Sequence, residues 1–163
     1  MRSKKLTVLA LLTALSMILS YIEGLLPAFV AIPGIKVGLA NLAVVLALYR
    51  LGWREAICVS LVRVLCLSLL FGNAASLAYS IAGAALSLGG MVILKKTMRF
   101  SPLAVSVTGG VLHNIGQLLM ACVLLSTTAL RYYLPFLLLG GILAGIVIGV
   151  IAAILLKRIP DSF

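Results

Sequence analysis

The sequence predicts an all-α membrane protein: a compact bundle of six transmembrane helices with both termini on the cytoplasmic side. Hydrophobic residues make up 64% of the 163 residues, and charged residues only 10%. A soluble domain carries about 25% charged residues, so this composition indicates a surface covered mainly by lipid. Long apolar runs recur along the chain. No linker is long enough to separate two domains, so we expect residues 1–163 to form a single domain.

The first predicted helix covers residues 6–26 and follows a basic segment that contains Arg2, Lys4 and Lys5. This arrangement imitates a secretory signal, whose apolar core has about 7–15 residues. The present apolar run is longer, it can span a bilayer, and five more predicted spans follow it. We therefore expect an uncleaved first helix.

Prolines and glycines separate the first helix from the second. Pro27 ends the first helix, and Pro33 and Gly34 break helical geometry in the connector that follows. The six predicted helices cover residues 6–26, 37–49, 55–71, 77–94, 103–125 and 134–157. The second helix is short for a full span, so it either tilts into the bundle or begins within the membrane.

Basic residues are distributed unevenly between the two predicted membrane faces. One face carries Lys36 and Arg131, and Arg63 lies inside the third helix. The other ten Lys and Arg residues fall on the opposite face: Arg2, Lys4, Lys5, Arg50, Arg54, Lys95, Lys96, Arg99, Lys157 and Arg158. Because Lys and Arg next to membrane spans stay in the cytoplasm, this bias predicts cytoplasmic termini. It is the pattern of topology signals, and we expect no nucleic-acid partner.

Acidic residues are scarce, which limits the chemistry that the chain can perform. Glu23, Glu55 and Asp161 are the three that the sequence contains. Enzymes that bind Mg²⁺-diphosphate or pair two carboxylates need more acidic groups than this. One histidine and no cysteine cluster leave too few ligands for a metal site. We therefore predict a protein that is not an enzyme by itself and holds no metal or cofactor.

Small residues recur at helix-packing distances in three of the predicted helices. In lipid, such residues let two backbones approach closely. They are Ala10 and Ala14 in the first helix, Gly83, Ser87 and Gly90 in the fourth, and Gly141, Gly145 and Gly149 in the sixth. Each set predicts packing within the bundle, and each could instead dock a separate membrane protein.

Polar residues inside the apolar segments are the strongest functional signal. An arginine at the centre of a span, here Arg63, costs about 2.5–3.5 kcal/mol on insertion scales. It should therefore face a polar cavity or a partner. In the fifth predicted helix, Gly109, His113 and Gln117 recur every four residues, and Asn114 follows the histidine. Spacing of this kind places the imidazole and the amide on one helix face.

The depths of these polar residues predict a pocket that opens to the outside. Arg63 and the fifth-helix residues lie near mid-membrane, and Glu23 and Asn73 lie nearer the external end. Asn41 adds a further amide, and Lys36 lies at the external mouth. This pocket would be net positive and would favour an anionic or strongly polar ligand. In the alternative interpretation, Arg63 forms a structural bridge with Glu23, and the amides and the histidine only join helices.

Three motifs resemble the signature of the Gx transporter family, which is also labelled heptaprenyl diphosphate synthase component I. They are Pro-Gly-Ile-Lys-Val-Gly-Leu-Ala-Asn at 33–41, Leu-Phe-Gly-Asn at 70–73 and His-Asn-Ile-Gly-Gln at 113–117. More broadly, the six helices, the outward pocket and the small pair Ala10 and Ala14 resemble the substrate-binding S component of energy-coupling-factor (ECF) vitamin transporters.

This resemblance implies a substrate-binding subunit in the plasma membrane of a prokaryote, surrounded by lipid. The substrate would be a small polar or anionic micronutrient, or a quinone or isoprenoid precursor. Ala10 and Ala14 would dock a transmembrane T component. Two cytoplasmic ATPases would power transport as separate chains, because no GxxxxGK[ST] loop is present. The substrate would contact Arg63, His113, Asn114, Gln117, Asn41, Asn73, Glu23 and Lys36.

Two other functions remain open at this point. The first, which the family label suggests, is a membrane accessory subunit of a polyprenyl (heptaprenyl) diphosphate synthase. The second is a self-contained secondary transporter or a purely structural membrane subunit. Secondary carriers normally combine internal repeats with ion-coupling groups, and six helices with a single external carboxylate argue against one.

Overall fold

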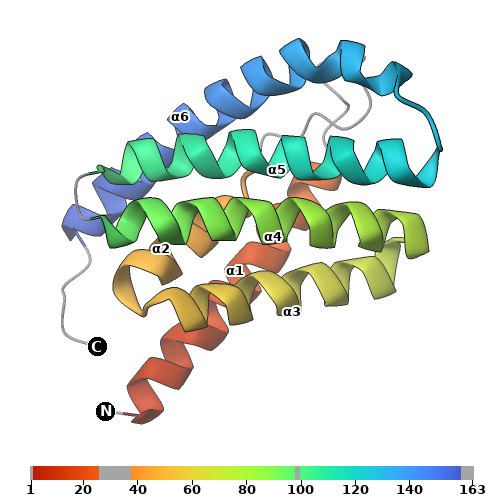
Figure 1. The fold of residues 1–163 in the computed structure, drawn as a ribbon. Helices are drawn as coiled ribbons and strands as arrows, with labels where there is room; N and C mark the ends of the chain where they lie inside the picture. Colours follow the sequence, from red (N-terminus) through yellow and green to blue (C-terminus); the bar gives the residue numbers. More distant parts are fainter. Residues whose placement is uncertain (1, 26–37, 98–99, 159–163) are drawn as a thin grey trace.

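The computed structural model describes residues 2–25, 38–97 and 100–158, which form helices joined by short turns (Figure 1). The α-helices in these ranges are α1 (Arg2–Leu25), α2 (Asn41–Arg50), α3 (Trp53–Phe71), α4 (Ala74–Lys96), α5 (Pro102–Leu124) and α6 (Leu134–Arg158). A short 3₁₀ helix, η1 (Ala129–Tyr133), precedes α6. The described residues contain no strand, and the predicted all-α class is confirmed.

Four helical segments are long and apolar enough to cross a membrane: Ser3–Glu23, Ala74–Lys96, Pro102–Leu124 and Ala129–Arg158. They indicate a membrane protein. Helix α3 has 19 residues but contains three charged side chains, Arg54, Glu55 and Arg63. Helix α2 has 10 residues, which at 1.5 Å per residue gives about 15 Å against a hydrocarbon core of about 30 Å. Six complete spans and the orientation of the termini stay predictions.

Helix α2 is shorter than predicted and lies in the centre of the bundle. Its residues 43–48 are all buried. Four of them belong to the same core cluster as Val59 of α3, Met91 of α4 and Val105 of α5: Val44, Val45, Ala47 and Leu48. Its start at Asn41 follows a turn in which Gly38 has a φ of +75°. This backbone conformation suits glycine. The two predicted alternatives for this helix, a tilt into the bundle and a start within the membrane, both stay predictions.

Helix α5 lies between α4 and α6 and packs closely on both (Figure 1). A Cβ atom added to Gly145 of α6 would lie 2.5 Å from the Cα of Val107. One added to Gly116 of α5 would lie 2.6 Å from the carbonyl oxygen of Ala82 in α4. Neither distance is possible for a real side chain. Close contacts of this kind occur at eight glycines of these helices, which therefore serve packing within the bundle: Gly83, Gly90, Gly109, Gly110, Gly116, Gly141, Gly145 and Gly149.

The basic residues of several helices meet at one end of the bundle. Lys95 donates a hydrogen bond to the carbonyl oxygen of Leu48 at the end of α2, and Arg50 donates one to the carbonyl oxygen of Leu156 near the end of α6. Cations are favourable at such sites because unpaired carbonyls make helix C-termini partially negative. An ion pair between Lys5 and Glu55 joins α1 to α3 at the same end. These contacts gather the predicted cytoplasmic charges on one side.

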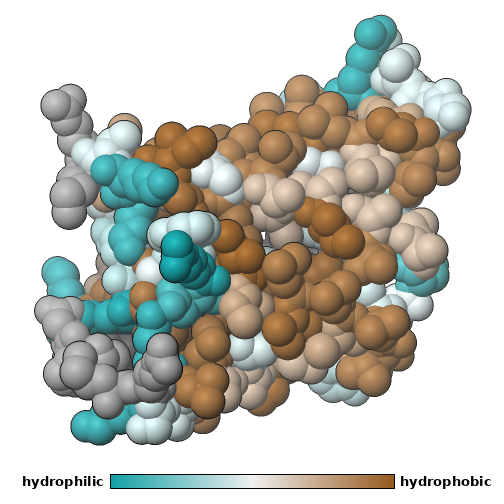
Figure 2. Space-filling view, turned by 60° about the horizontal axis from the view of Figure 1, so that its bottom comes forward, coloured by the Kyte–Doolittle hydropathy of each residue, from teal (hydrophilic) through white to brown (hydrophobic). Residues whose placement is uncertain are grey.

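A broad hydrophobic band lies between two hydrophilic ends of the molecular surface (Figure 2). Helix α1 contributes much of its length to the surface, since Ser16 is the one buried residue among its described side chains. Ala10 and Ala14 are both exposed on this helix. The predicted docking face is therefore accessible in the isolated chain.

Candidate functional site: a polar cavity inside the bundle

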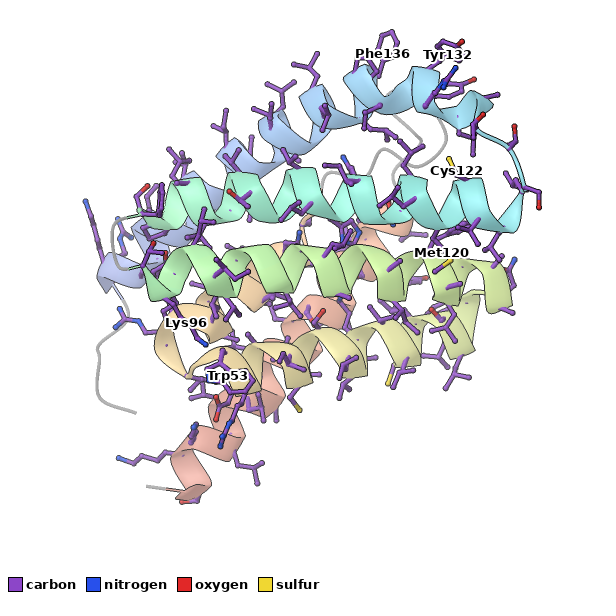
Figure 3. The ribbon with its side chains drawn as sticks, viewed as in Figure 1. Trp53, Lys96, Met120, Cys122, Tyr132 and Phe136 are labelled. Atoms are coloured by element: carbon purple, nitrogen blue, oxygen red, sulfur yellow. The ribbon has the colours of Figure 1, made fainter. Side chains whose placement is uncertain are left out.

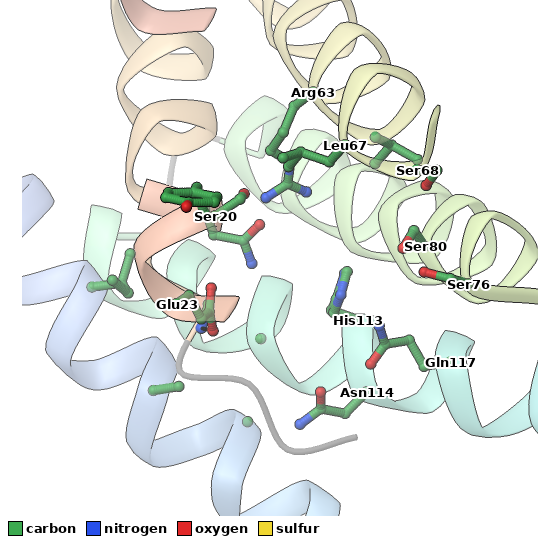
Figure 4. A pocket seen from close by; sticks show the side chains of 18 of the residues that line it. Ser20, Glu23, Arg63, Leu67, Ser68, Ser76, Ser80, His113, Asn114 and Gln117 are labelled. Carbon is green, nitrogen blue, oxygen red and sulfur yellow. Dashed lines mark hydrogen bonds between the residues drawn. The ribbon is translucent and has the colours of Figure 1, made fainter. Parts of the chain in front are cut away.

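A cavity of about 430 Å³ lies among the helices and is lined by residues of all six α-helices. Polar side chains face it from different directions (Figure 4). Its lining includes Leu25 and Phe71 at the helix ends that lie away from the basic end, and Ile148 deeper in α6. The cavity therefore extends from the middle of the bundle toward the end opposite the basic cluster.

Arg63 enters the cavity from the middle of α3 and is only 8% exposed. Figure 4 shows its guanidinium directed away from the α3 backbone into the space that His113 approaches from the other side. Glu23 is the carboxylate that acts on it electrostatically. In the described part of the chain, no hydrogen bond joins the guanidinium to another residue.

Glu23 lines the cavity near the end of α1, and its carboxylate also holds the turn that precedes α2. Its Oε1 accepts a hydrogen bond of 2.5 Å from the backbone N–H of Gly38. Gly38 in turn accepts a hydrogen bond of 2.8 Å from the N–H of Asn41. The carboxylate therefore supports the turn that begins α2, besides attracting Arg63. The two interpretations of Arg63, ligand group and structural partner of Glu23, are compatible with this geometry.

Helix α5 provides the imidazole and both amides on its cavity side (Figure 4). Asn114 is 3% exposed, and its Nδ2 donates a hydrogen bond of 2.8 Å to the carbonyl oxygen of Leu137 in α6. His113 and Gln117 pack against Gly83 of α4, where an added Cβ would lie 2.9 Å from His113 Cε1. Gly83 therefore gives these two side chains the room they occupy beside α4.

Five serine side chains also line the cavity, and the sequence patterns did not predict them as site residues. They are Ser20, Ser68, Ser76, Ser80 and Ser106. Serine is common in packed membrane helices, so its presence alone does not predict a site. The spacing of Ser76 and Ser80, four residues apart on α4, was the available signal, because it places both on one helix face.

The structure brings six of the eight predicted substrate-binding residues to this cavity: Glu23, Asn41, Arg63, His113, Asn114 and Gln117. Asn73 is not among the lining residues. It precedes α4, and its Oδ1 accepts a hydrogen bond of 2.8 Å from the N–H of Ser76, so it caps that helix. Lys36 and residues 33–37 of the first motif lie outside the described residues. Substrate contact stays a prediction for all eight.

The arrangement suits recognition of a polar molecule by hydrogen bonds and one or two charges. Among the described lining residues, one basic side chain, Arg63, and one acidic side chain, Glu23, carry opposite charges. The predicted net positive charge of the pocket would therefore depend on Lys36. No group of three or more His, Cys, Asp or Glu side chains suited to a metal ion occurs in the described ranges.

Apolar helices of membrane-spanning length around a polar cavity indicate a helical membrane protein with an internal polar cavity. The chain matches the model of the family described as heptaprenyl diphosphate synthase component I over residues 12–155, and it belongs to that family. The description as a component implies that members associate with other subunits. Neither the curated proteins nor the solved structures compared with it contain a match.

Proposed function

We propose that this protein captures a small polar or anionic substrate as the membrane subunit of an uptake system of the ECF type. The observation that carries the proposal is the cavity that encloses Arg63. Its volume of about 430 Å³ falls in the range of about 300–1,000 Å³ typical of small-molecule sites. An ionisable group inside a membrane bundle is by default a functional group.

The exposed small face of α1 supports association with a second membrane protein. Ala10 and Ala14 lie one helical turn apart on the surface, where they permit close approach of another helix. In this proposal they dock a T component, and separate ATPases supply the energy. The protein itself performs no catalysis.

The family description favours a second candidate, an accessory subunit of a polyprenyl diphosphate synthase. In this role the chain would hold the partner subunit or its prenyl chain at the membrane. The Mg²⁺-binding carboxylates of a synthase would belong to the partner, because this sequence contains three acidic residues in all.

Native mass spectrometry of the protein purified in mild detergent tests the proposed role of the cavity. We expect a small polar molecule bound to the wild-type protein and lost in Arg63→Gln. Arg131→Gln is the matched control, because Arg131 is exposed in η1 and does not line the cavity. Retention of the same ligand by Arg63→Gln would contradict the proposal.

Identification of the co-purified subunits separates the two candidates. A T component with ATPases supports uptake, and a soluble prenyl diphosphate synthase supports the accessory role. A prenyl diphosphate in the mass spectrum, in place of a small polar molecule, would likewise favour the accessory role.

A further inference from the structure

A second cavity lies between α3 and α4, and unlike the first it is apolar. It has a volume of about 460 Å³ and an almost entirely apolar lining. Leu61, Ile81 and Ile93 are exposed along it. Gly89 lies between them, and a Cβ added there would have no neighbour within 4 Å. The lining is therefore an open groove on the outer surface, about as apolar as lipid itself.

The groove has a basic and aromatic end. Trp53 lines it and is 46% exposed. The guanidinium carbon of Arg54 lies 5.2 Å from the centre of the Trp53 ring, and the Nζ of Lys96 lies 5.9 Å from it. Figure 3 shows Trp53 and Lys96 at the neighbouring ends of α3 and α4. Two exposed cations therefore flank the indole where the groove reaches the basic end of the bundle.

We propose that this groove is a binding site for an anionic phospholipid. One acyl chain lies between α3 and α4, and the phosphate lies between Arg54 and Lys96. Tryptophan favours the depth of the lipid headgroups, which places the indole at the level of the glycerol. The charge of the two cations selects an anionic lipid over a zwitterionic one. The apolar groove thus suits the acyl chain of the lipid, and the two cations at its end suit the phosphate.

The polar cavity and the groove share one wall residue. Val64, which is 5% exposed, lines both, and it follows Arg63 directly in α3. A lipid chain in the groove therefore supports the helix that positions the guanidinium.

Trp53 is the single tryptophan of the chain, and its fluorescence reports on the groove directly. We would reconstitute the full-length protein in vesicles that contain phosphatidylglycerol or phosphatidylcholine brominated near the glycerol end of the acyl chain. Each basic residue near the surface adds about 1 kcal/mol, or about a fivefold preference, for anionic lipid. We expect brominated phosphatidylglycerol to quench Trp53 at correspondingly lower mole fractions than brominated phosphatidylcholine.

Single substitutions then distinguish specific lipid binding in the groove from general attraction of anionic lipids to the basic end. Lys96→Gln should reduce the preference for phosphatidylglycerol about fivefold. Lys157→Gln is its control, because Lys157 is also exposed at the basic end but is not one of the two cations that flank Trp53. Gly89→Leu should weaken quenching by both lipids while leaving thermal stability unchanged, since open space surrounds that position.

Three results would overturn the proposal. The first is equal quenching by the two lipids in the wild-type protein. The second is an equal effect of Lys157→Gln and Lys96→Gln, which would show diffuse attraction in place of a site. The third is relief of quenching by a short-chain prenyl diphosphate at concentrations far below that of the lipid, which would assign the groove to an isoprenoid.

Discussion

The described lining of the polar cavity contains two charged side chains, Arg63 and Glu23. Different contacts hold them in place. Glu23 is anchored by the N–H of Gly38. Arg63 is buried on α3, and the carboxylate attracts it. In a low-dielectric interior a charge without compensation is costly. The carboxylate therefore stabilises Arg63 in the absence of ligand, and an anionic ligand would compete with it for the guanidinium.

A double-mutant cycle measures how far Arg63 serves the ligand and how far it serves the fold. We expect Arg63→Gln to lower ligand affinity roughly ten- to hundredfold, because a charge-assisted hydrogen bond contributes about 1.5–3 kcal/mol. Its thermal stability should stay near that of the wild type. The measurement is ligand affinity and melting temperature for Arg63→Gln, for Glu23→Gln and for both together.

The opposite pattern supports the purely structural interpretation. In that case each single variant would be unstable, and the double variant would recover stability, because it leaves no buried charge without compensation. Normal ligand binding in an unstable Arg63→Gln protein would show that the arginine does not contact the ligand.

At the scale of helices, α5 holds the bundle and the cavity together. It packs on α6 through glycines, and its polar side reaches the cavity. A Cβ on Gly145 would meet the backbone of Val107. Backbone atoms cannot move aside as a flexible side chain can, so α6 would have to shift away from α5.

We therefore expect Gly145→Val to destabilise the protein by about 1–3 kcal/mol, the usual range for overpacking. Gly89→Ala is the control, because an added Cβ there meets nothing within 4 Å and alanine is the better helix former. Thermal unfolding in detergent gives both values. A Gly145→Val protein as stable as Gly89→Ala would mean that α5 and α6 are not packed as described.

Sequence patterns predicted the long helices and much of the cavity. The spacing of His113 and Gln117 fixes their common face on α5, and the cost of an arginine in lipid requires a polar surrounding for Arg63. Asn73 shows the limit of this reasoning. An asparagine near a helix end can face a pocket or cap the helix, and its backbone environment selects the cap. The length of α2 also depends on the central position that the other helices give it.

At the scale of the whole molecule, the basic residues of α1 to α4 and α6 converge on one end. Contacts such as Lys95 with Leu48 show that these residues also stabilise helix ends. The positive-inside rule predicts that this end faces the cytoplasm. In that orientation the cavity would extend toward the external side, as the proposed uptake function requires.

Labelling of single cysteines tests this orientation. The natural cysteines, Cys58, Cys66 and Cys122, must first be replaced, since Cys58 is exposed. In intact cells, a membrane-impermeant thiol reagent should modify cysteines placed at Asn73 or near Arg131. It should modify those near Lys96 or Arg54 only after the cells are opened. External labelling near Lys96 would reverse the orientation and turn the cavity toward the cytoplasm.

The exposed face of α1 is where assembly with another membrane protein is expected. Ala10 and Ala14 leave room for a second helix to approach, and a bulky residue would fill that room. Ala14→Trp should therefore abolish co-purification with a T component, while the isolated chain still binds its ligand, because Ala14 does not line the cavity. Val147→Trp on the exposed surface of α6 is the control for added bulk. Intact assembly in Ala14→Trp, or equal loss in both variants, would remove this face of α1 as the docking surface.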